Sequence, residues 1–145
     1  MKITICGSIS STPKIKEVDE QLHNIGHTTE VPYTSGKIIN GELTLKEYFT
    51  EVEKNGDNNL RNQADHDLIK RYYNYIKNSD AILVLNIDKN GIKNYIGGNV
   101  LMEIGYAYVL DKKIFSLNDI PAMQYTDELK AMKPIVINGD LKKII

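Results

Sequence analysis

One carboxylate stands alone in an apolar stretch of the sequence. From Asn94 to Leu110 the residues are NYIGGNVLMEIGYAYVL, and Glu103 is the only one with a formal charge. A surface helix normally keeps a polar face, so this run predicts a buried helix of about 11 residues that follows Gly97-Gly98-Asn99. A buried, unpaired carboxylate loses its charge or costs several kcal/mol. Glu103 is therefore predicted to have a structural partner, such as an ion pair or a dimer-interface hydrogen bond, or to do chemistry.

The chemistry open to Glu103 follows from the turn that precedes it. Glycine lets the backbone approach a ligand closely, and Gly97, Gly98 and Asn99 stand where the N–H groups of a new helix are free. Helical spacing puts Glu103 on the side of Asn99, so its carboxyl is expected to point back toward this turn. A carboxylate in that position can attack an anomeric carbon or stabilise an oxocarbenium-like centre.

A hydroxyl-rich loop near the start is the second candidate site. Gly7, Ser8, Ile9 and Ser10 follow an apolar run and lead to Thr12-Pro13, a pair that predicts a helix with Thr12 as its N-cap. The N–H groups of such a helix favour an anion and the hydroxyls add donors, so a 5′-phosphate is the expected guest. Ordinary capping explains the hydroxyls equally well, because neither common glycine-rich phosphate-loop motif is present.

The elements that would position these residues alternate along the chain. Strands are expected at 3–6, 27–31, 81–85, 113–117 and 134–137, with helices at 13–25, 64–78, 99–110 and 126–132. This order predicts an α/β fold, a doubly wound, five-stranded parallel sheet with helices on both faces. The unbroken apolar run at 81–85 is typical of a strand covered on both faces.

In such a sheet the ligand lies at the carboxyl ends of the strands, near the switch in strand order. Besides the two loops and Glu103, that rule brings three more polar residues to the site: Asn86, Asp88 and Asn118. We expect the first two to hydrogen-bond a sugar hydroxyl or a base. Tyr33 and Tyr106 either stack on a base or only pack.

The stretch 33–61 is predicted to be an irregular insertion, either a lid over the site or a solvated segment without a role. Thr44-Leu45-Lys46-Glu47 is a capping-box pattern and predicts one short helix inside it. A turn is expected at 55–59.

Composition limits the remaining possibilities. At 145 residues the chain is expected to be one domain, 1–145, and its net charge of -1 gives no reason to expect a nucleic-acid partner. Cys6 is the single cysteine, and His23, His27 and His66 lack metal-ligand spacing, so no disulfide and no metal site are expected. The start lacks a long apolar segment, which favours a cytoplasmic protein away from membranes.

Three stretches resemble the nucleoside 2-deoxyribosyltransferase superfamily: CGSI at 6–9, SDAILV at 79–84 and GGNVLMEIGYA at 97–107. The first is especially similar to 2′-deoxynucleoside 5′-phosphate N-hydrolases, and the resemblance covers residues 1 to 118. It implies a flavodoxin-like, Rossmann-like fold and cleavage of the N-glycosidic bond of deoxynucleosides or their 5′-monophosphates. It also implies work without metal or organic cofactor, as homodimers or higher oligomers.

Carried over by position, the resemblance makes Glu103 the nucleophile and gives Gly7 and Ser8 the phosphate or sugar end of the substrate. Three positions depart from the family. Its phosphate-binding serine six residues before the glutamate is replaced by Gly97, its first-strand tyrosine by Thr4, and the helix aspartate that partners the nucleophile by Tyr72. Tyr72 and Tyr106 are the residues expected to support Glu103 instead.

Three functions follow from these patterns. The leading one is N-glycosidic bond cleavage or transfer on nucleosides or nucleotides through a glutamate nucleophile. The alternative is a non-catalytic nucleotide-binding or sensor module of the same fold, which the three departures favour. A third, an FMN-binding flavodoxin-like protein, is disfavoured because the chain has no tryptophan and no Thr-Gly-rich loop.

Overall fold

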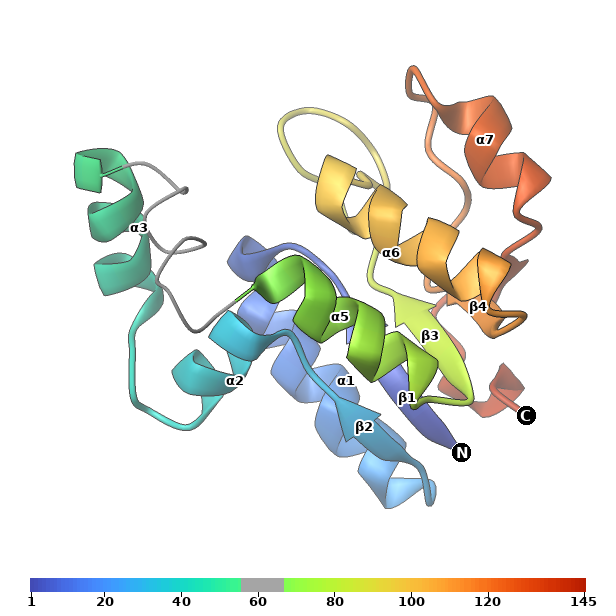
Figure 1. Ribbon diagram of the computed structural model, residues 1–145, viewed down its shortest axis with the longest axis horizontal. Helices are drawn as coiled ribbons and strands as arrows, with labels where there is room; N and C mark the ends of the chain where they lie inside the picture. The colour runs from blue at the N-terminus through green and yellow to red at the C-terminus, as the bar shows by residue number, and fades with distance from the viewer. Residues whose placement is uncertain (56–66) are drawn as a thin grey trace.

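A computed structural model describes residues 1–55 and 67–145 of the chain. The strands are β1 (Lys2–Cys6), β2 (Thr28–Glu30), β3 (Ala81–Val84), β4 (Lys113–Ser116) and β5 (Ile135–Val136). The helices are α1 (Thr12–Asn24), α2 (Tyr33–Ile39), α3 (Leu45–Asn55), α5 (Leu68–Lys77), α6 (Gly98–Val109) and α7 (Thr126–Ala131), with 3₁₀ turns η1 (Ile9–Ser11) and η2 (Leu141–Lys143). Figure 1 shows these elements in chain order. The five expected strands and the four expected helices all form, with ends that differ by a few residues.

The five strands make one parallel sheet in the order β2-β1-β3-β4-β5. This is the flavodoxin-like strand order, so the predicted doubly wound sheet is confirmed. The chain leaves β1 toward β2 on one side and returns to β3 on the other. The point where the order reverses therefore lies between β1 and β3, whose register pairs Ile3 with Ala81 and Cys6 with Val84.

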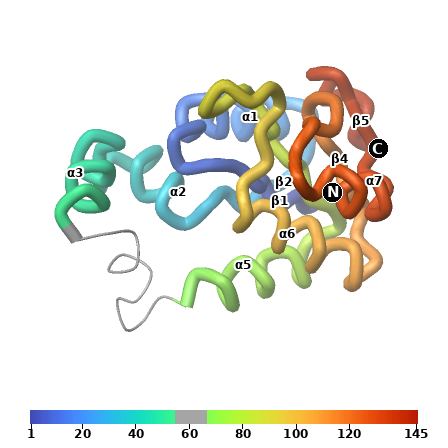
Figure 2. The backbone as a smooth tube through the Cα atoms, turned by 90° about the horizontal axis from the view of Figure 1, so that it is seen from above, coloured from blue at the N-terminus to red at the C-terminus, as the bar shows by residue number. Residues whose placement is uncertain are grey.

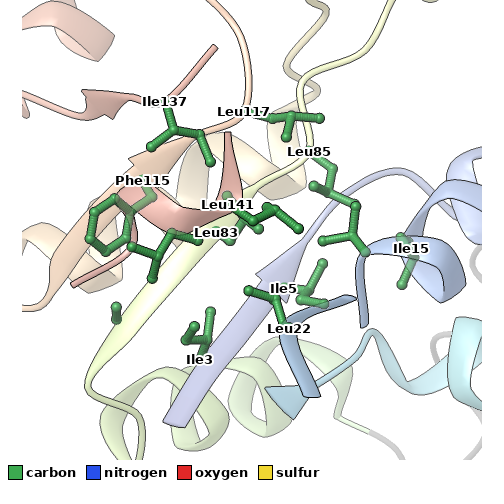
Figure 3. Close-up of a cluster of buried hydrophobic side chains, with 13 residues drawn as sticks. Ile3, Ile5, Ile15, Leu22, Leu83, Leu85, Phe115, Leu117, Ile137 and Leu141 are labelled. Carbon is green, nitrogen blue, oxygen red and sulfur yellow. The ribbon is translucent and has the colours of Figure 1, made fainter. Parts of the chain in front are cut away.

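Alternate residues of the strands build two cores, one on each face of the sheet. Ile3, Ile5 and Leu83 point to the face that α1 covers, where the cluster of Figure 3 forms. Ile82 and Val84 point to the opposite face, against residues of α5, α6 and α7. Figure 2 shows α1 on one side of the strands and α5 and α6 on the other. A strand buried on both faces has no polar alternation, which is why 81–85 reads as a continuous apolar run.

The stretch after β2 is more regular than expected. Residues 33–39 form α2, so the prediction of irregular structure is wrong for this range. Residues 45–55 form α3, which is the short helix that the capping-box pattern predicts. Local sequence pattern does not reveal α2, because the helix is held by a contact with a distant segment. Ser35 Oγ of α2 and Thr12 Oγ1 of α1 form a buried hydrogen bond of 2.9 Å. The same contact explains a second error. Thr12 is the first residue of α1 and not its N-cap, since its hydroxyl turns to Ser35 and to the Ile9 carbonyl.

The predicted capping box is confirmed. Thr44 N–H donates to Glu47 Oε2 at 2.9 Å, and Glu47 N–H donates to Thr44 Oγ1 at 3.1 Å. Residues 56–59 of the predicted turn and the predicted helical residues 64–66 lie outside the described residues. α3 stands away from the sheet in both Figures 1 and 2, and a lid role for 33–61 stays a prediction. None of the helices in the described ranges is long and apolar enough to cross a membrane, and the cytoplasmic location stays a prediction.

We predict that Leu83→Ala lowers the free energy of unfolding by about 2–5 kcal/mol, because it opens a cavity in a fully buried strand at the centre of the sheet. Ile135→Ala is the matched control. Ile135 lies on the edge strand β5 and is 49% exposed, so its loss should cost less than about 1 kcal/mol. Urea denaturation measures both, and equal losses would contradict this placement of the two strands.

Candidate functional site

A pocket of about 130 Å³ opens at the switch point of the sheet. The segments after β1 and β3 and the first turns of α6 form its walls. It is lined by Gly7, Ser8, Ser11, Leu85, Ile87, Lys89, Tyr95, Gly97, Asn99, Val100 and Glu103. The structure thus brings together five residues that the sequence pointed to: Gly7, Ser8, Gly97, Asn99 and Glu103.

Glu103 reaches the pocket from the second turn of α6. Gly97 is the N-cap of the helix, and the spacing of four places Asn99 and Glu103 on one face. Val100 and Ile104, both buried, flank the acid and pack into the core beneath it. Glu103 is only 8% exposed, and its Oε2 has no hydrogen-bond partner within residues 1–55 and 67–145. A buried, unpartnered carboxyl oxygen therefore borders the pocket.

Burial sets the protonation state of Glu103. Loss of solvent raises its pKa from 4.5 to about 8, and the Cys6 thiol opposes part of that rise as a hydrogen-bond donor. The pKa of Cys6 is itself raised well above its usual value, by burial and then by the nearby carboxyl. With its pKa raised in this way, Glu103 is mostly protonated at pH 7. A group that gains or loses its proton near neutral pH is suited to chemistry.

Tyr72 lies near Glu103 without lining the pocket. Its hydroxyl accepts a hydrogen bond of 3.1 Å from the Tyr33 N–H, which joins α5 to the start of α2. Burial, and then the neighbouring carboxyl of Glu103, raise the pKa of the Tyr72 phenol. A neutral group thus occupies the position where the resembled family has an aspartate. Whether Tyr72 supports the acid stays a prediction.

The two tyrosines expected to stack on a base have other neighbours. Tyr106 packs edge-on against Tyr73, with ring centroids 5.6 Å apart, between α6 and α5. Tyr33 faces a separate groove beside β2, where Lys37 and Arg71 lie over its ring. Neither residue is part of the pocket lining.

The opposite wall of the pocket carries a cation that sequence reasoning missed. Lys89 Nζ donates to Ser8 Oγ at 2.6 Å, and Ser8 Oγ lies 2.9 Å from Ser10 Oγ. The sequence offered one local signal, the Asn90-Gly91 pair after Lys89, which is typical of a two-residue hairpin turn but does not place the lysine side chain. Ile9 and Ser10 belong to η1 and do not themselves line the pocket.

Three expected substrate contacts hold the framework of the site instead of lining it. The buried Asn86 amide donates to the carbonyls of Asn118 and Asp119 and accepts from the Asn118 N–H. Asn118 Nδ2 returns a hydrogen bond of 3.0 Å to the Asn86 carbonyl. Asp88 Oδ1 accepts the Asn94 N–H at 2.9 Å. These bonds fix the loops after β3 and β4, and contact with a substrate stays a prediction for all three residues.

The ring of Tyr95 lies against Gly97. A Cβ placed on Gly97 would lie 3.3 Å from Tyr95 Cε1 and 3.5 Å from its hydroxyl, so a side chain there requires the ring to move by a few tenths of an ångström. The serine of the resembled family is thus replaced by a glycine with an aromatic ring against it. A Cβ on Gly98 would meet no atom within 4 Å, and Gly98 is exposed.

Comparisons with known proteins support the fold. No family model and no curated protein matches the chain. A solved structure, that of the Clostridium botulinum CMP N-glycosidase BcmB, is similar over 95% of this chain and 90% of its own, with a TM-score of 0.50 and 13% identity. Two chains with so little sequence in common share an architecture, and the residues of the site carry any further argument.

The burial of Glu103 predicts how stability depends on pH. Between pH 4.5 and 8 the unfolded chain ionises this acid while the folded chain keeps it protonated, so the wild type loses stability as pH rises through this window. Glu103→Gln does not titrate. From pH 5 to pH 8 its free energy of unfolding should therefore rise relative to that of the wild type, by a few kcal/mol at most.

Urea denaturation at pH 5, 6.5 and 8 measures this difference. Glu17→Gln is the control, because Glu17 lies on the surface and Lys14 lowers its pKa. It should show no such gain. A constant difference between Glu103→Gln and the wild type at the three pH values would contradict a raised pKa.

Proposed function

We propose that this protein cleaves or transfers the N-glycosidic bond of nucleosides or their 5′-monophosphates, with Glu103 as the nucleophile. The observation that carries the proposal is the buried, unpartnered Oε2 of Glu103 on the wall of the switch-point pocket. The fold shared with a CMP N-glycosidase supports the same class of reaction.

The reaction needs one group to attack and one to leave. With the sugar in the pocket, the ionised Glu103 carboxylate forms a bond to C1′ while the C1′–N bond breaks. The base departs with the electron pair of that bond and takes up a proton from solvent, and the group that later displaces Glu103 returns a proton to solvent. Water then displaces Glu103 from C1′ in a hydrolase, and a second base does so in a transferase. Because Oε2 has no existing hydrogen bond in the described part of the chain, none must be broken before it attacks.

The size of the pocket indicates which part of the substrate it holds. At about 130 Å³ it is smaller than the roughly 300–1,000 Å³ of cavities that enclose whole drug-sized ligands. A sugar with its 5′ substituent is a better match than a complete nucleotide. We infer that the base extends from the pocket toward solvent.

A second candidate is a protein that binds a nucleotide without cleaving it. Its support is the protonation of Glu103, which is mostly neutral at pH 7. The hydroxyl of Thr4, where the resembled family has a tyrosine, bonds Ser79 in the core at 2.8 Å instead of reaching the pocket. Such a module would bind intact nucleotide tightly and release no base.

Base release decides between the two. The protein is incubated with the common ribo- and deoxyribonucleosides and their 5′-monophosphates, and free base is measured by chromatography. We expect release from at least one substrate, with a rate that rises with pH up to about 8 because the attacking form is the carboxylate. Glu103→Ala should lower the rate by about 10³-fold or more.

Glu17→Ala, a change on the surface of α1, should leave the rate unchanged. Release that persists in Glu103→Ala would remove the catalytic role. Tight binding of intact nucleotide without release would favour the non-catalytic alternative.

We also propose that the chain forms a homodimer through the outer face of α6. Met102, Gly105 and Val109 lie along one stripe of this helix, with Met102 38% and Val109 71% exposed. Exposed apolar side chains that share one helix face, unlike single scattered ones, favour a contact with another protein surface.

Sedimentation velocity tests the dimer. The wild type should sediment as a dimer, with twice the 16.4 kDa mass of one chain, and the Val109→Glu variant should sediment as a monomer. Ile145→Glu, at an 82% exposed residue of the C-terminus, should not. A monomeric wild type would contradict the proposal.

A further inference from the structure

The loop after β3 holds Lys89 in a fixed position. Lys89 and Ile92 exchange two backbone hydrogen bonds, of 3.1 and 2.9 Å, across Asn90 and Gly91. Both turn residues have positive φ, +52° and +73°, as a two-residue type I′ hairpin requires. The loop is closed at its base by a bond of 3.1 Å from the Tyr95 N–H to the Ile87 carbonyl. Lys89 thus extends from a small, regular hairpin.

Within residues 1–55 and 67–145, the ammonium of Lys89 contacts a hydroxyl and forms no ion pair. Lys89 Nζ donates a hydrogen bond to Ser8 Oγ, and the Ser8 hydroxyl is also hydrogen-bonded to the Ser10 hydroxyl. Among residues 1–55 and 67–145, no ion pair joins Lys89 to a carboxylate. It is half-buried, and its Nζ lies 5.7 Å from the centre of the Tyr95 ring. A half-buried cation that faces a pocket without a balancing charge favours an anionic ligand.

Glu103, the acid of the pocket lining, does not supply the charge that would balance Lys89. Burial and Cys6 account for the pKa of Glu103, and Lys89 is not among the groups that shift it. Glu103 stands on α6 and Lys89 on the loop after β3, so the two side chains reach the pocket from different segments. A ligand that spans them has an anionic end at Lys89 and a reacting centre at Glu103.

We propose that Lys89, with the hydroxyls of Ser8 and Ser10, binds the 5′-phosphate of the substrate and makes the protein selective for nucleoside 5′-monophosphates over nucleosides. The inference rests on the proposed function for the rest of the substrate. The ammonium donates a charge-assisted hydrogen bond to a phosphate oxygen, and Ser8 turns its hydroxyl from Ser10 to the phosphate.

The first experiment compares substrates. Lys89→Met keeps most of the apolar stem and removes the charge. It should lower kcat/KM for a 5′-monophosphate about 10- to 100-fold and leave kcat/KM for the matching nucleoside within about 2-fold. Lys93→Met, an exposed lysine of the same loop, is the matched control and should change neither value. Lys89→Arg should retain most of the activity on the monophosphate because it keeps the charge. An equal loss on both substrates in Lys89→Met would overturn the assignment.

A second experiment needs no turnover. Binding of ribose 5-phosphate and of ribose is measured by NMR titration with the wild type, Lys89→Met and Lys93→Met. We expect the wild type to bind the phosphate ester at least about 10-fold more tightly than ribose, and Lys89→Met to lose that preference. If Lys89→Met does not fold, the wild-type preference, and its decrease with added salt, still test the phosphate site.

The outcomes separate this inference from the proposed function. Binding that depends on Lys89 without any base release leaves the phosphate site standing and removes the glycosidase proposal. Base release that depends on Glu103, together with equal binding of ribose and ribose 5-phosphate, does the reverse.

Discussion

The desolvation of one carboxyl group is the constraint on which the site depends. Glu103 lies in α6, the helix that packs on β3 and β4, between the core residues Val100 and Ile104. In that surrounding the charged form is disfavoured, and the proton is lost only near pH 8. A stabilising side chain at this place would be leucine or methionine. An acid that weakens the fold at neutral pH is the kind of residue that activity retains and stability alone does not.

The fold explains why the acid meets the hydroxyl loop. β1 and β3 are neighbours in the sheet, but the chain leaves them in opposite directions, so the loops that follow them diverge and leave a crevice. The Gly7–Ser8 loop occupies one wall and the start of α6 the other. Asn86 and Asn118 tie the loops after β3 and β4 together through four hydrogen bonds, one of them to the Asp119 carbonyl, and Asp88 accepts a hydrogen bond at the end of the hairpin. Part of the crevice wall is thus held by hydrogen bonds within the protein.

The sequence predicted the sheet because its strands and helices have strong local signals. Apolar runs and the turn residues around them place all five strands, and the strand order follows from crossover rules. The position of Glu103 was predictable because a single charge in an apolar helix leaves few possibilities. Contacts between distant segments left no such trace. Residues 33–39, which the local pattern predicted to be irregular, form α2, and Ser35 of this helix is hydrogen-bonded to Thr12 of α1.

The same limit applies within the site. Asn86 and Asn118 were expected at the ligand because they follow strands, but their amides satisfy backbone groups across 32 residues of sequence. Lys89 was missed because a lysine in a loop is ordinarily solvated, and only its bond to Ser8, 81 residues away, gives it a place in the pocket. The most direct test of this account is a titration of the Glu103 side-chain carboxyl carbon by ¹³C NMR, with Glu103→Gln identifying its resonance. The account predicts a midpoint near pH 8. A midpoint near 4.5, the value of a solvated glutamate, would contradict it.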